Sequence, residues 1–165
     1  MIVGHGAIAH ALTDRDDRLY FAAGVADSQE TRDEEFGRER ALLHSQERFR
    51  HIVYFSSLCV FTQDTRYARH KREMEALIRQ FPAWTVMRLG NIDWAENPCQ
   101  LVPFIRRKLR DREPFNIYDE YRHILIKDEF LYWVGFIPPW NCEMNVTGQR
   151  LKVADLIARY QGSWH

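Results

Sequence analysis

The stretch HIVYFSSLCVFTQDTRYARHKREMEALIRQFPAWTVMRLGNI (51–92) decides the fold class. It opens with a short apolar run, which is typical of a buried strand. Its middle part has Met74, Leu77, Ile78 and Phe81 at helical spacing, which predicts a helix. Its last part is apolar again and ends with Gly-Asn, which predicts a second strand. Strand, helix and strand in this order form the unit from which parallel sheets are built.

The same alternation continues on both sides of this stretch. Before it, we predict strands at 1–3 and 18–24 and helices at 7–12 and 30–49. After it, we predict helices at 100–111, 127–137 and 151–160 and short strands at 123–126 and 143–146, with Pro103 interrupting the first helix. This order favours an α/β fold, in which helices cover both faces of a parallel sheet. No linker, repeat or low-complexity segment is visible, so residues 1–165 are predicted to form one domain.

The charge balance argues against two classes of partner. The chain carries 23 basic and 23 acidic side chains, whereas proteins that bind nucleic acids or membrane surfaces usually have a basic excess. The basic cluster Arg106 to Arg112 is interpreted as the outer face of a helix, because Phe104, Ile105 and Leu109 supply an apolar side. We therefore expect neither a nucleic-acid nor a membrane partner.

Cysteine and histidine positions bear on the cellular setting and on metal binding. Cys59, Cys99 and Cys142 have no metal-ligand spacing and cannot all pair with one another, which favours a reduced, cytoplasmic setting. The histidines are scattered, so we expect no metal site. The first residues lack the pattern of a signal peptide, and no apolar run is long enough to cross a membrane.

The first motif with chemical content is Gly4-His5-Gly6-Ala7-Ile8-Ala9, a G-x-G-x-x-A turn between a predicted strand and a predicted helix. Glycines at such a turn let the backbone approach a pyrophosphate, and the helix N-terminus offers free N–H groups to it. The alternative is an ordinary glycine-rich turn, which is common before helices.

The second motif is the pair Ser56 and Ser57, where the strand 51–57 ends. In a parallel sheet this edge is where ligands bind. The alternative is a serine that caps a helix or a turn.

The third motif is Tyr67-x-x-x-Lys71. Residues four apart share a helix face, so the hydroxyl and the ammonium can point to one place. A nearby cation favours the phenolate and lowers the tyrosine pKa from its usual value of about 10 towards a useful range. The alternative is a solvated helix face that carries both residue types by chance.

Together the three motifs follow the order seen in the short-chain dehydrogenase/reductase superfamily. The chain most resembles its NAD-dependent epimerase/dehydratase branch, the extended type, which acts mostly on nucleotide sugars. Further segments resemble that branch in register over nearly the whole chain: YFAAGVADS (20–28), VYFSSLCVF (53–61), VMRLGNI (86–92), NPCQLVPFI (97–105), HILIKDEF (123–130) and MNVTGQRLKVADLI (144–157).

The resemblance implies a shortened Rossmann-like fold that binds NAD or NADP, with a small C-terminal substrate-side cap mainly in 92–150. It implies that Ser57, Tyr67 and Lys71 are catalytic. Tyr67 would move the hydroxyl proton, Lys71 would lower its pKa and hold the nicotinamide ribose, and Ser57 would hydrogen-bond the reacting oxygen. The implied cofactor-binding residues are Gly4, Gly6, Ala7, Ile8, Ala23, Gly24, Tyr67, Lys71 and Leu89. The implied substrate-binding residues are Ser57, Asn91 and Arg122.

The chain departs from the family pattern in three places. Two strands and a helix usually separate the glycine-rich helix from the AAG strand, and they carry the residue that reads the adenosine ribose; here that segment is absent. The choice between NAD and NADP is therefore left open. Ser57 precedes Tyr67 by only ten residues, where the family has a longer loop. The family arginine falls on Tyr121, with Arg122 displaced by one position.

The function that the resemblance implies is an NAD(P)-dependent epimerase, dehydratase or reductase acting on a nucleotide sugar. One alternative is a degenerate binding protein that keeps the fold and has lost turnover, and another is a ketoreductase with a non-nucleotide substrate. Members of the superfamily commonly dimerise through the helix that carries Tyr-x-x-x-Lys and the helix before it. We therefore expect a homodimer or a higher homo-oligomer, built on the helices 30–48 and 65–80.

Overall fold

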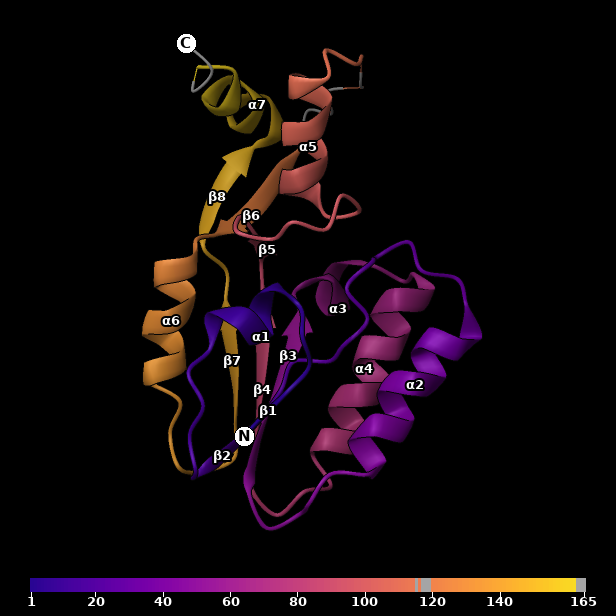
Figure 1. Ribbon diagram of the computed structural model, residues 1–165, viewed down its shortest axis with the longest axis vertical. Coiled ribbons are helices and arrows are strands. Elements are labelled where there is room, and N and C mark those ends of the chain that lie inside the picture. The colour runs from indigo at the N-terminus through magenta and orange to yellow at the C-terminus, as the bar shows by residue number, and fades with distance from the viewer. Residues whose placement is uncertain (115, 117–119, 163–165) are drawn as a thin grey trace.

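The computed structural model describes residues 1–114, 116 and 120–162, so positions 115 and 117–119 of the expected cap lie outside the described residues. Within the described residues, one sheet has five parallel strands in the order β1-β2-β3-β4-β7. Their bounds are β1 (Ile2–Val3), β2 (Arg18–Phe21), β3 (His51–Ser57), β4 (Trp84–Leu89) and β7 (Cys142–Val146). The predicted parallel sheet is confirmed (Figure 1).

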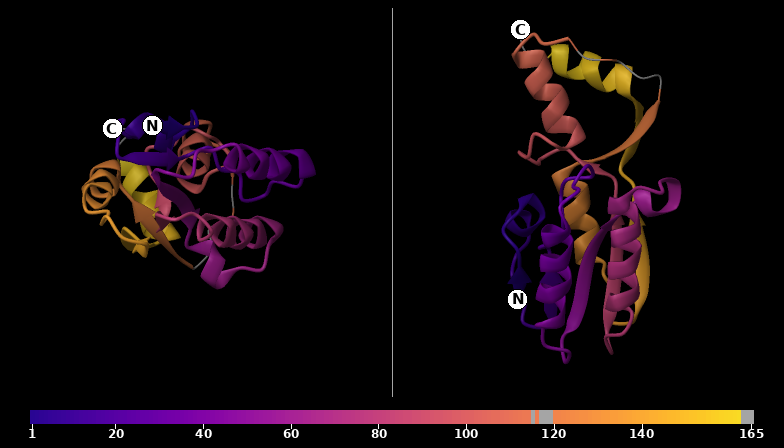
Figure 2. Two further views of the ribbon diagram at one scale, coloured as in Figure 1. Left: turned by 90° about the horizontal axis from the view of Figure 1, so that it is seen from below. Right: turned by 90° about the vertical axis from the view of Figure 1, so that its right-hand side faces the viewer.

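Helices cover both faces of this sheet (Figures 1 and 2). One face carries α2 (Asp33–His44) and α4 (Arg66–Ile78), and the other carries α1 (Ala7–Ala11) and α6 (Lys127–Gly135). A one-turn helix, α3 (Cys59–Thr62), follows β3 directly.

Neighbouring residues of the central strand supply the two halves of the core. Tyr54 faces α4 and belongs to a buried cluster with Met74. Phe55 faces the opposite side and belongs to a cluster with Phe130 of α6, whose ring centroid lies 5.6 Å away. Successive side chains of a strand point to opposite faces, so an uninterrupted apolar run is what a sheet covered on both faces requires.

A second, smaller sheet lies beyond the carboxyl ends of the main strands (Figure 1). Its central strand β6 (Tyr121–Leu125) pairs parallel with β5 (Asn91–Ile92) and antiparallel with β8 (Gln149–Lys152). Two helices, α5 (Leu101–Arg110) and α7 (Val153–Gly162), pack on it. This small sheet has its own buried cluster, which consists of Val102, Ile105, Ile124, Val153, Leu156 and Ile157.

The chain passes between the main sheet with its helices and the small sheet at three places. Ile126 joins β6 to α6, and the other two crossings are neighbours. Gly90 joins β4 to β5, and Thr147 and Gly148 join β7 to β8. The Gly90 N–H donates to the Val146 carbonyl at 3.0 Å, and a Cβ at position 90 would collide with the Thr147 carbonyl oxygen. Gly148 has φ +69°, which favours glycine. Both connections therefore depend on the absence of a side chain.

Among the predicted details that differ from the structure, two concern α5 and α7. Pro103 does not interrupt α5, because it lies in the first turn, where the backbone N–H has no partner within the helix. Residues 151 and 152, predicted as the start of the last helix, instead belong to β8 and pair with Arg122 and Tyr121. Pairing across the small sheet thus outweighs the local helical pattern.

None of the helices that the structure describes is both long and apolar enough to span a lipid bilayer. The same described residues contain no group of three or more His, Cys, Asp or Glu side chains arranged to hold a metal ion.

Candidate active site

Most of the site residues proposed from the sequence lie at the carboxyl ends of the main strands (Figure 1). Gly4 follows β1, Ala23 and Gly24 follow β2, Ser57 is the last residue of β3, and Leu89 is the last residue of β4. Parallel strands end at one edge, so the fold brings these residues from four separate segments to the same side of the sheet.

The glycine turn between β1 and α1 has two different glycines. Gly4 has φ +125°, and a Cβ there would lie 2.6 Å from the Ala22 carbonyl carbon, so this glycine is needed for the turn itself. Gly6 has an ordinary φ of −85°, and a Cβ there would meet nothing within 4 Å. The Trp94 indole N–H donates to the Ala7 carbonyl at 3.1 Å and thereby ties this turn to the segment after β5.

Ser57 lies close enough to Tyr67 for its hydroxyl to lower the pKa of the tyrosine. The Cys59 backbone N–H donates to the Ser57 hydroxyl at 3.3 Å. Tyr67 stands in the first turn of α4, which begins after Thr65, whose side chain accepts from the Ala68 N–H at 3.2 Å. The N-cap therefore fixes the start of the helix that presents Tyr67 to the end of β3.

The pKa of Tyr67 is raised above its ordinary value of 10.0. Burial is the largest cause, and the negative charges that Cys59, Glu39 and Asp27 can carry act in the same direction, while the Ser57 hydrogen bond opposes them. The sequence predicts the opposite shift, on the assumption that the Lys71 cation acts on Tyr67 without a competing anion. In the structure the tyrosine is buried and the Glu39 carboxylate acts on it, so that assumption does not hold.

Lys71 is on the same helix face as Tyr67, but its ammonium is engaged by other groups. Its Nζ lies 5.5 Å from the centre of the Tyr67 ring. It donates to the Tyr54 hydroxyl at 3.0 Å and to the Glu39 carboxylate at 3.3 Å, and the lysine side chain is only 3% exposed. A Cβ at Gly24 would lie 2.6 Å from this Nζ, so the backbone after β2 passes directly over the ammonium.

Glu39 of α2 is the partner that sequence reasoning missed. Burial by itself would raise the pKa of its carboxyl group, but the Lys71 ammonium, the His70 ring and the Val25 N–H together hold that pKa well below its usual range. A signal for it exists in the sequence. Glu39 lies three residues after Phe36 and four before Leu43, so a charged side chain falls on the apolar stripe of its helix.

Ser56 and Ser57 have different environments. The Ser56 hydroxyl points into the sheet face covered by α4 and donates to the Glu75 carboxylate at 2.7 Å. Glu75 also accepts two hydrogen bonds from Arg88 of β4, at 2.8 and 2.6 Å. Ser56 is therefore part of a buried polar network, and it is Ser57 whose hydroxyl acts on the pKa of Tyr67.

The proposed substrate-binding residues Asn91 and Arg122 lie on the small sheet. The Asn91 side-chain amide donates to the His123 carbonyl at 3.0 Å, which ties β5 to β6. Arg122 of β6 donates to the Tyr121 carbonyl at 3.3 Å and lies 2.5 Å from the Glu120 carboxylate. Both side chains thus have partners within the small sheet.

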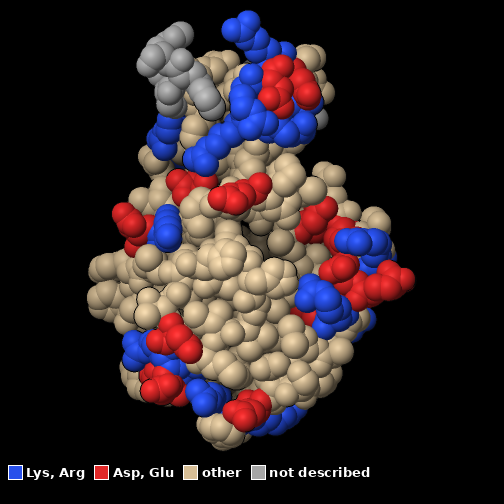
Figure 3. All heavy atoms as spheres, in the orientation of Figure 1, with Lys and Arg blue, Asp and Glu red and all other residues tan. Residues whose placement is uncertain are grey.

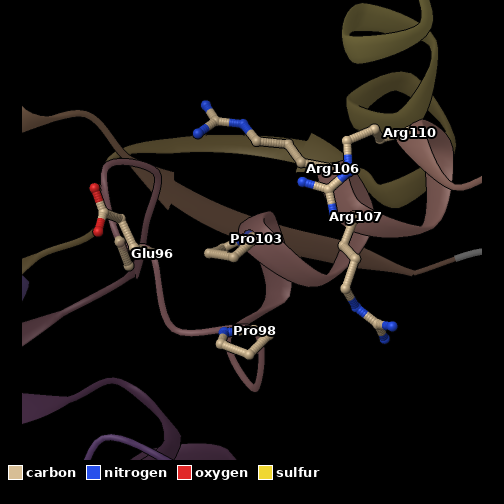
Figure 4. Close-up of a pocket in the computed structure, with 7 residues that line it drawn as sticks. Glu96, Pro98, Pro103, Arg106, Arg107 and Arg110 are labelled. Carbon is tan, nitrogen blue, oxygen red and sulfur yellow. The ribbon is translucent and has the colours of Figure 1, made fainter.

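A pocket of about 400 Å³ opens between α5 and the segment that precedes it (Figure 4). It is lined by Ala95, Glu96, Pro98, Pro103, Arg106, Arg107 and Arg110. Figure 4 shows the guanidinium groups of Arg106 and Arg107 on opposite sides, and Arg106 stacks on Tyr160 with its Cζ 4.6 Å from the ring centre. In Figure 3, basic side chains gather over the small sheet and its helices, and the surface below them is hollowed towards the main sheet.

No family model matches this chain, and no curated protein matches it. Solved structures do match. The Bordetella bronchiseptica enzyme WbmG in complex with NAD has a TM-score of 0.67 and 13% sequence identity, and the match covers 89% of this chain and 56% of that one. The Streptomyces venezuelae dTDP-glucose 4,6-dehydratase DesIV, with NAD and DAU bound, has a TM-score of 0.66, 13% identity and coverages of 89% and 57%. A UDP-galactose 4-epimerase has a TM-score of 0.63, 16% identity and coverages of 87% and 61%.

These matches confirm, at the level of the fold, the resemblance seen in the sequence. The fold is Rossmann-like, and the chain spans little more than half the length of the solved structures just named. Within the described residues β1 is an edge strand of the main sheet. This position agrees with the absence, in the sequence, of the two strands that usually follow the glycine-rich helix.

Proposed function

We propose that this chain is an NAD(P)-dependent oxidoreductase of the epimerase/dehydratase type, that it acts on a nucleotide sugar, and that Ser57, Tyr67 and Lys71 form its catalytic site. The observation that carries the proposal is the Lys71 ammonium 5.5 Å from the Tyr67 ring, with Ser57 close enough to act on the tyrosine hydroxyl, at the sheet edge that also holds the glycine turn. Each group alone has an ordinary structural explanation. Their convergence from β3 and α4 beside that turn is what the proposed chemistry requires.

The turn after β1 fits the pyrophosphate of a dinucleotide. Gly4 supports a turn that only glycine can make, and the space beyond Gly6 is open, so a phosphate can approach the backbone there. We propose that Gly4, Gly6, Ala7, Ile8, Ala23, Gly24 and Leu89 line the cofactor site. The bound nicotinamide would supply the hydride acceptor and donor. The adenosine end has no counterpart of the usual strands within the described residues, so NAD or NADP would bind mainly through its phosphates and nicotinamide half.

In this proposal the chain's own residues orient the substrate and move one proton. Tyr67 would accept the proton from the substrate hydroxyl as hydride leaves the same carbon, and it would return that proton in the reverse step. Ser57 would hydrogen-bond the same oxygen and hold it at the tyrosine. Within the part of the chain that the structure describes, the Lys71 ammonium donates two hydrogen bonds, so one of its three N–H groups remains for a ribose hydroxyl.

The substrate side would be formed by the small sheet. The arginine-lined pocket at α5 supports a substrate with phosphate groups, because guanidinium groups are suited to phosphate oxygens. Asn91 and Arg122 are proposed to contact the same substrate from β5 and β6. Binding of this kind would require Arg122 to exchange its present partner, Glu120, for the phosphate.

Gly6→Val tests cofactor binding at the turn. Because position 6 has an ordinary φ and open space, the valine should be accommodated without loss of stability. Its side chain should occupy the volume of the pyrophosphate and weaken NAD(P) binding roughly a hundredfold or more, which corresponds to about 2.7 kcal/mol. Isothermal titration with NAD and NADP measures the affinity, and thermal unfolding checks the fold.

The matched control for this test is Gly37→Val. A Cβ added at Gly37 would also meet nothing within 4 Å, but this residue lies in α2, away from the turn. The variant should bind the cofactor like the wild type. If folded Gly6→Val and Gly37→Val bind NAD(P) equally well, the dinucleotide site is not at this turn.

A second candidate function is a binding protein without turnover. The ion pair between Lys71 and Glu39 favours it, because a lysine whose charge is balanced exerts less influence on Tyr67. The two candidates differ in one measurement. A thermal-shift screen with NAD, NADP and nucleotide sugars identifies ligands for both, and only the enzyme converts a nucleotide sugar that it binds.

We also propose a homodimer formed through α2 and α4. These helices lie side by side on one face of the sheet (Figures 1 and 2), and Arg40 of α2 pairs with Glu73 of α4 at 3.5 Å. We expect light scattering at micromolar concentration to give at least twice the mass of the 19.7 kDa chain. A monomer mass under these conditions would contradict the prediction.

A further inference from the structure

Glu39 is a fully buried carboxylate with four hydrogen-bond donors around it. Its Oε1 accepts from the Tyr54 hydroxyl at 2.8 Å and from Lys71 at 3.3 Å. Its Oε2 accepts from the Val25 N–H at 2.8 Å and is 2.9 Å from the His70 Nε2. A buried charge is retained only where donors of this kind replace water, so the surroundings of Glu39 favour its ionised form.

These contacts determine where the Lys71 ammonium lies. Lys71 comes from α4, and both of its acceptors are on other elements, Glu39 on α2 and Tyr54 on β3. The backbone at Gly24 lies against another side of the ammonium, since a Cβ there would lie 2.6 Å from Nζ and 3.0 Å from the Glu39 Oε1. The ammonium is thus fixed between three segments.

With the proposed function as its basis, we propose that Glu39 is a positioning residue of the catalytic site: it holds the Lys71 ammonium beneath Gly24 and balances its charge beside Tyr67. Glu39 does not contact the reacting atoms in this assignment. It acts through Lys71, and it determines how strongly the lysine charge is felt at the tyrosine hydroxyl.

The influence of the Lys71 charge on the pKa of Tyr67 can be measured, because the charged and titratable groups near Tyr67 are known. They come from five parts of the chain: Tyr54 and Ser57 of β3, Cys59 of α3, Lys71 of α4 itself, Glu39 of α2 and Asp27 of the segment after β2. Burial raises the pKa of Tyr67 most, and the Glu39 carboxylate adds to it. If the Glu39 charge is removed, Lys71 becomes an uncompensated cation 5.5 Å from the tyrosine ring, in a site where charges are weakly screened.

Glu39→Gln is the direct test, because it keeps the size of the side chain and removes its charge. At a fixed alkaline pH the phenolate fraction of Tyr67 should rise at least about tenfold, which corresponds to a pKa lower by about one. Ultraviolet difference absorbance detects the tyrosinate, and the same titration in a Glu39→Gln/Tyr67→Phe variant assigns the signal to Tyr67. An unchanged titration in Glu39→Gln would overturn the proposal.

The double variant Glu39→Gln/Lys71→Met separates charge from packing. With both charges removed, Tyr67 should titrate as in the wild type. A rise in tyrosinate that persists in the double variant would show that its cause is loosened packing or the direct effect of the Glu39 charge, and not the Lys71 ammonium, so the proposal would then be wrong.

Stability provides a second readout that holds if Glu39→Gln folds poorly. Each single change, Glu39→Gln or Lys71→Met, leaves one buried charge without its partner, and the double change leaves none. The thermal unfolding midpoint of the double variant should therefore be higher than that of either single variant. If the losses in unfolding midpoint of the two single variants add up in the double variant, Glu39 does not hold Lys71.

Neither the tyrosinate titration nor thermal unfolding uses a substrate or a cofactor, so failure of the proposed reaction would not affect either result.

Discussion

Replacing Tyr67 with phenylalanine should reduce turnover of the proposed reaction by roughly 10²–10⁴-fold, the usual contribution of a positioned acid–base group. The change removes one hydroxyl group, and the ring keeps its place beside the Lys71 ammonium, 5.5 Å from its centre. Ser57 keeps the hydrogen bond from the Cys59 N–H. The fold and the cofactor affinity should therefore survive.

The matched control is Tyr132→Phe on α6, an exposed tyrosine on the opposite face of the sheet. It should turn over like the wild type. Ser57→Ala should cost less than Tyr67→Phe, since a hydrogen bond is lost and the proton donor remains. The assay follows nicotinamide absorbance or product with a nucleotide sugar from the binding screen. If Tyr67→Phe keeps the wild-type rate, the catalytic site is elsewhere.

Replacing Glu75 with alanine should destabilise the fold by about 3–5 kcal/mol, the usual cost of removing one member of a buried ion pair. Glu75 of α4 is 3% exposed and forms a bidentate ion pair with Arg88 of β4, in which Arg88 donates two hydrogen bonds at 2.8 and 2.6 Å. It also accepts from Ser56 at 2.7 Å. Without it, the buried Arg88 would keep only Glu143, at 2.8 Å, as an ionic partner among the described residues.

Glu73→Ala is the comparison for this prediction. Glu73 is on the same helix, its side chain is 61% exposed, and its partner Arg40 lies 3.5 Å away. Exposed ion pairs of this kind contribute at most about 1 kcal/mol. Urea denaturation of both variants gives the two free energies of unfolding. Equal losses for Glu73→Ala and Glu75→Ala would contradict the account of a buried network.

The sequence predicts the main sheet well because β2 and β3 contain short, uninterrupted apolar runs. The run in β3 needs no partner information to be recognised as a strand covered on both faces. The small sheet is predicted less well. Residues 151 and 152 follow a local helical pattern, and their assignment to β8 depends on pairing with β6, about thirty residues earlier in the chain. Long-range pairing of this kind leaves little local signal.

The candidate site likewise has residues that the sequence predicts from local spacing and one residue whose role depends on long-range packing. Tyr67 and Lys71 share a helix face by spacing alone, and Ser57 follows from the end of a strand, so the sequence could assemble all three. The role of Glu39 could not be predicted in this way. Its contact with Lys71 depends on how α2 packs against α4 and β3, and a glutamate on an apolar helix stripe has several possible partners. The expected shift in the pKa of Tyr67 is wrong chiefly because the tyrosine is buried, and the Glu39 carboxylate adds to that effect.

The paired connections at Gly90 and at Thr147–Gly148 also have a mechanical consequence. They are joined to each other, because the Gly90 N–H donates to the Val146 carbonyl, and a third crossing at Ile126 also links the small sheet to the helices of the main sheet. Ile92 of β5 and Leu125 of β6 belong to the same buried cluster as Phe130 and Val146, so the small sheet shares core contacts with the main sheet. These three crossings and the shared core restrict movement of the small sheet, and they keep the arginine-lined pocket beyond the ends of the main strands.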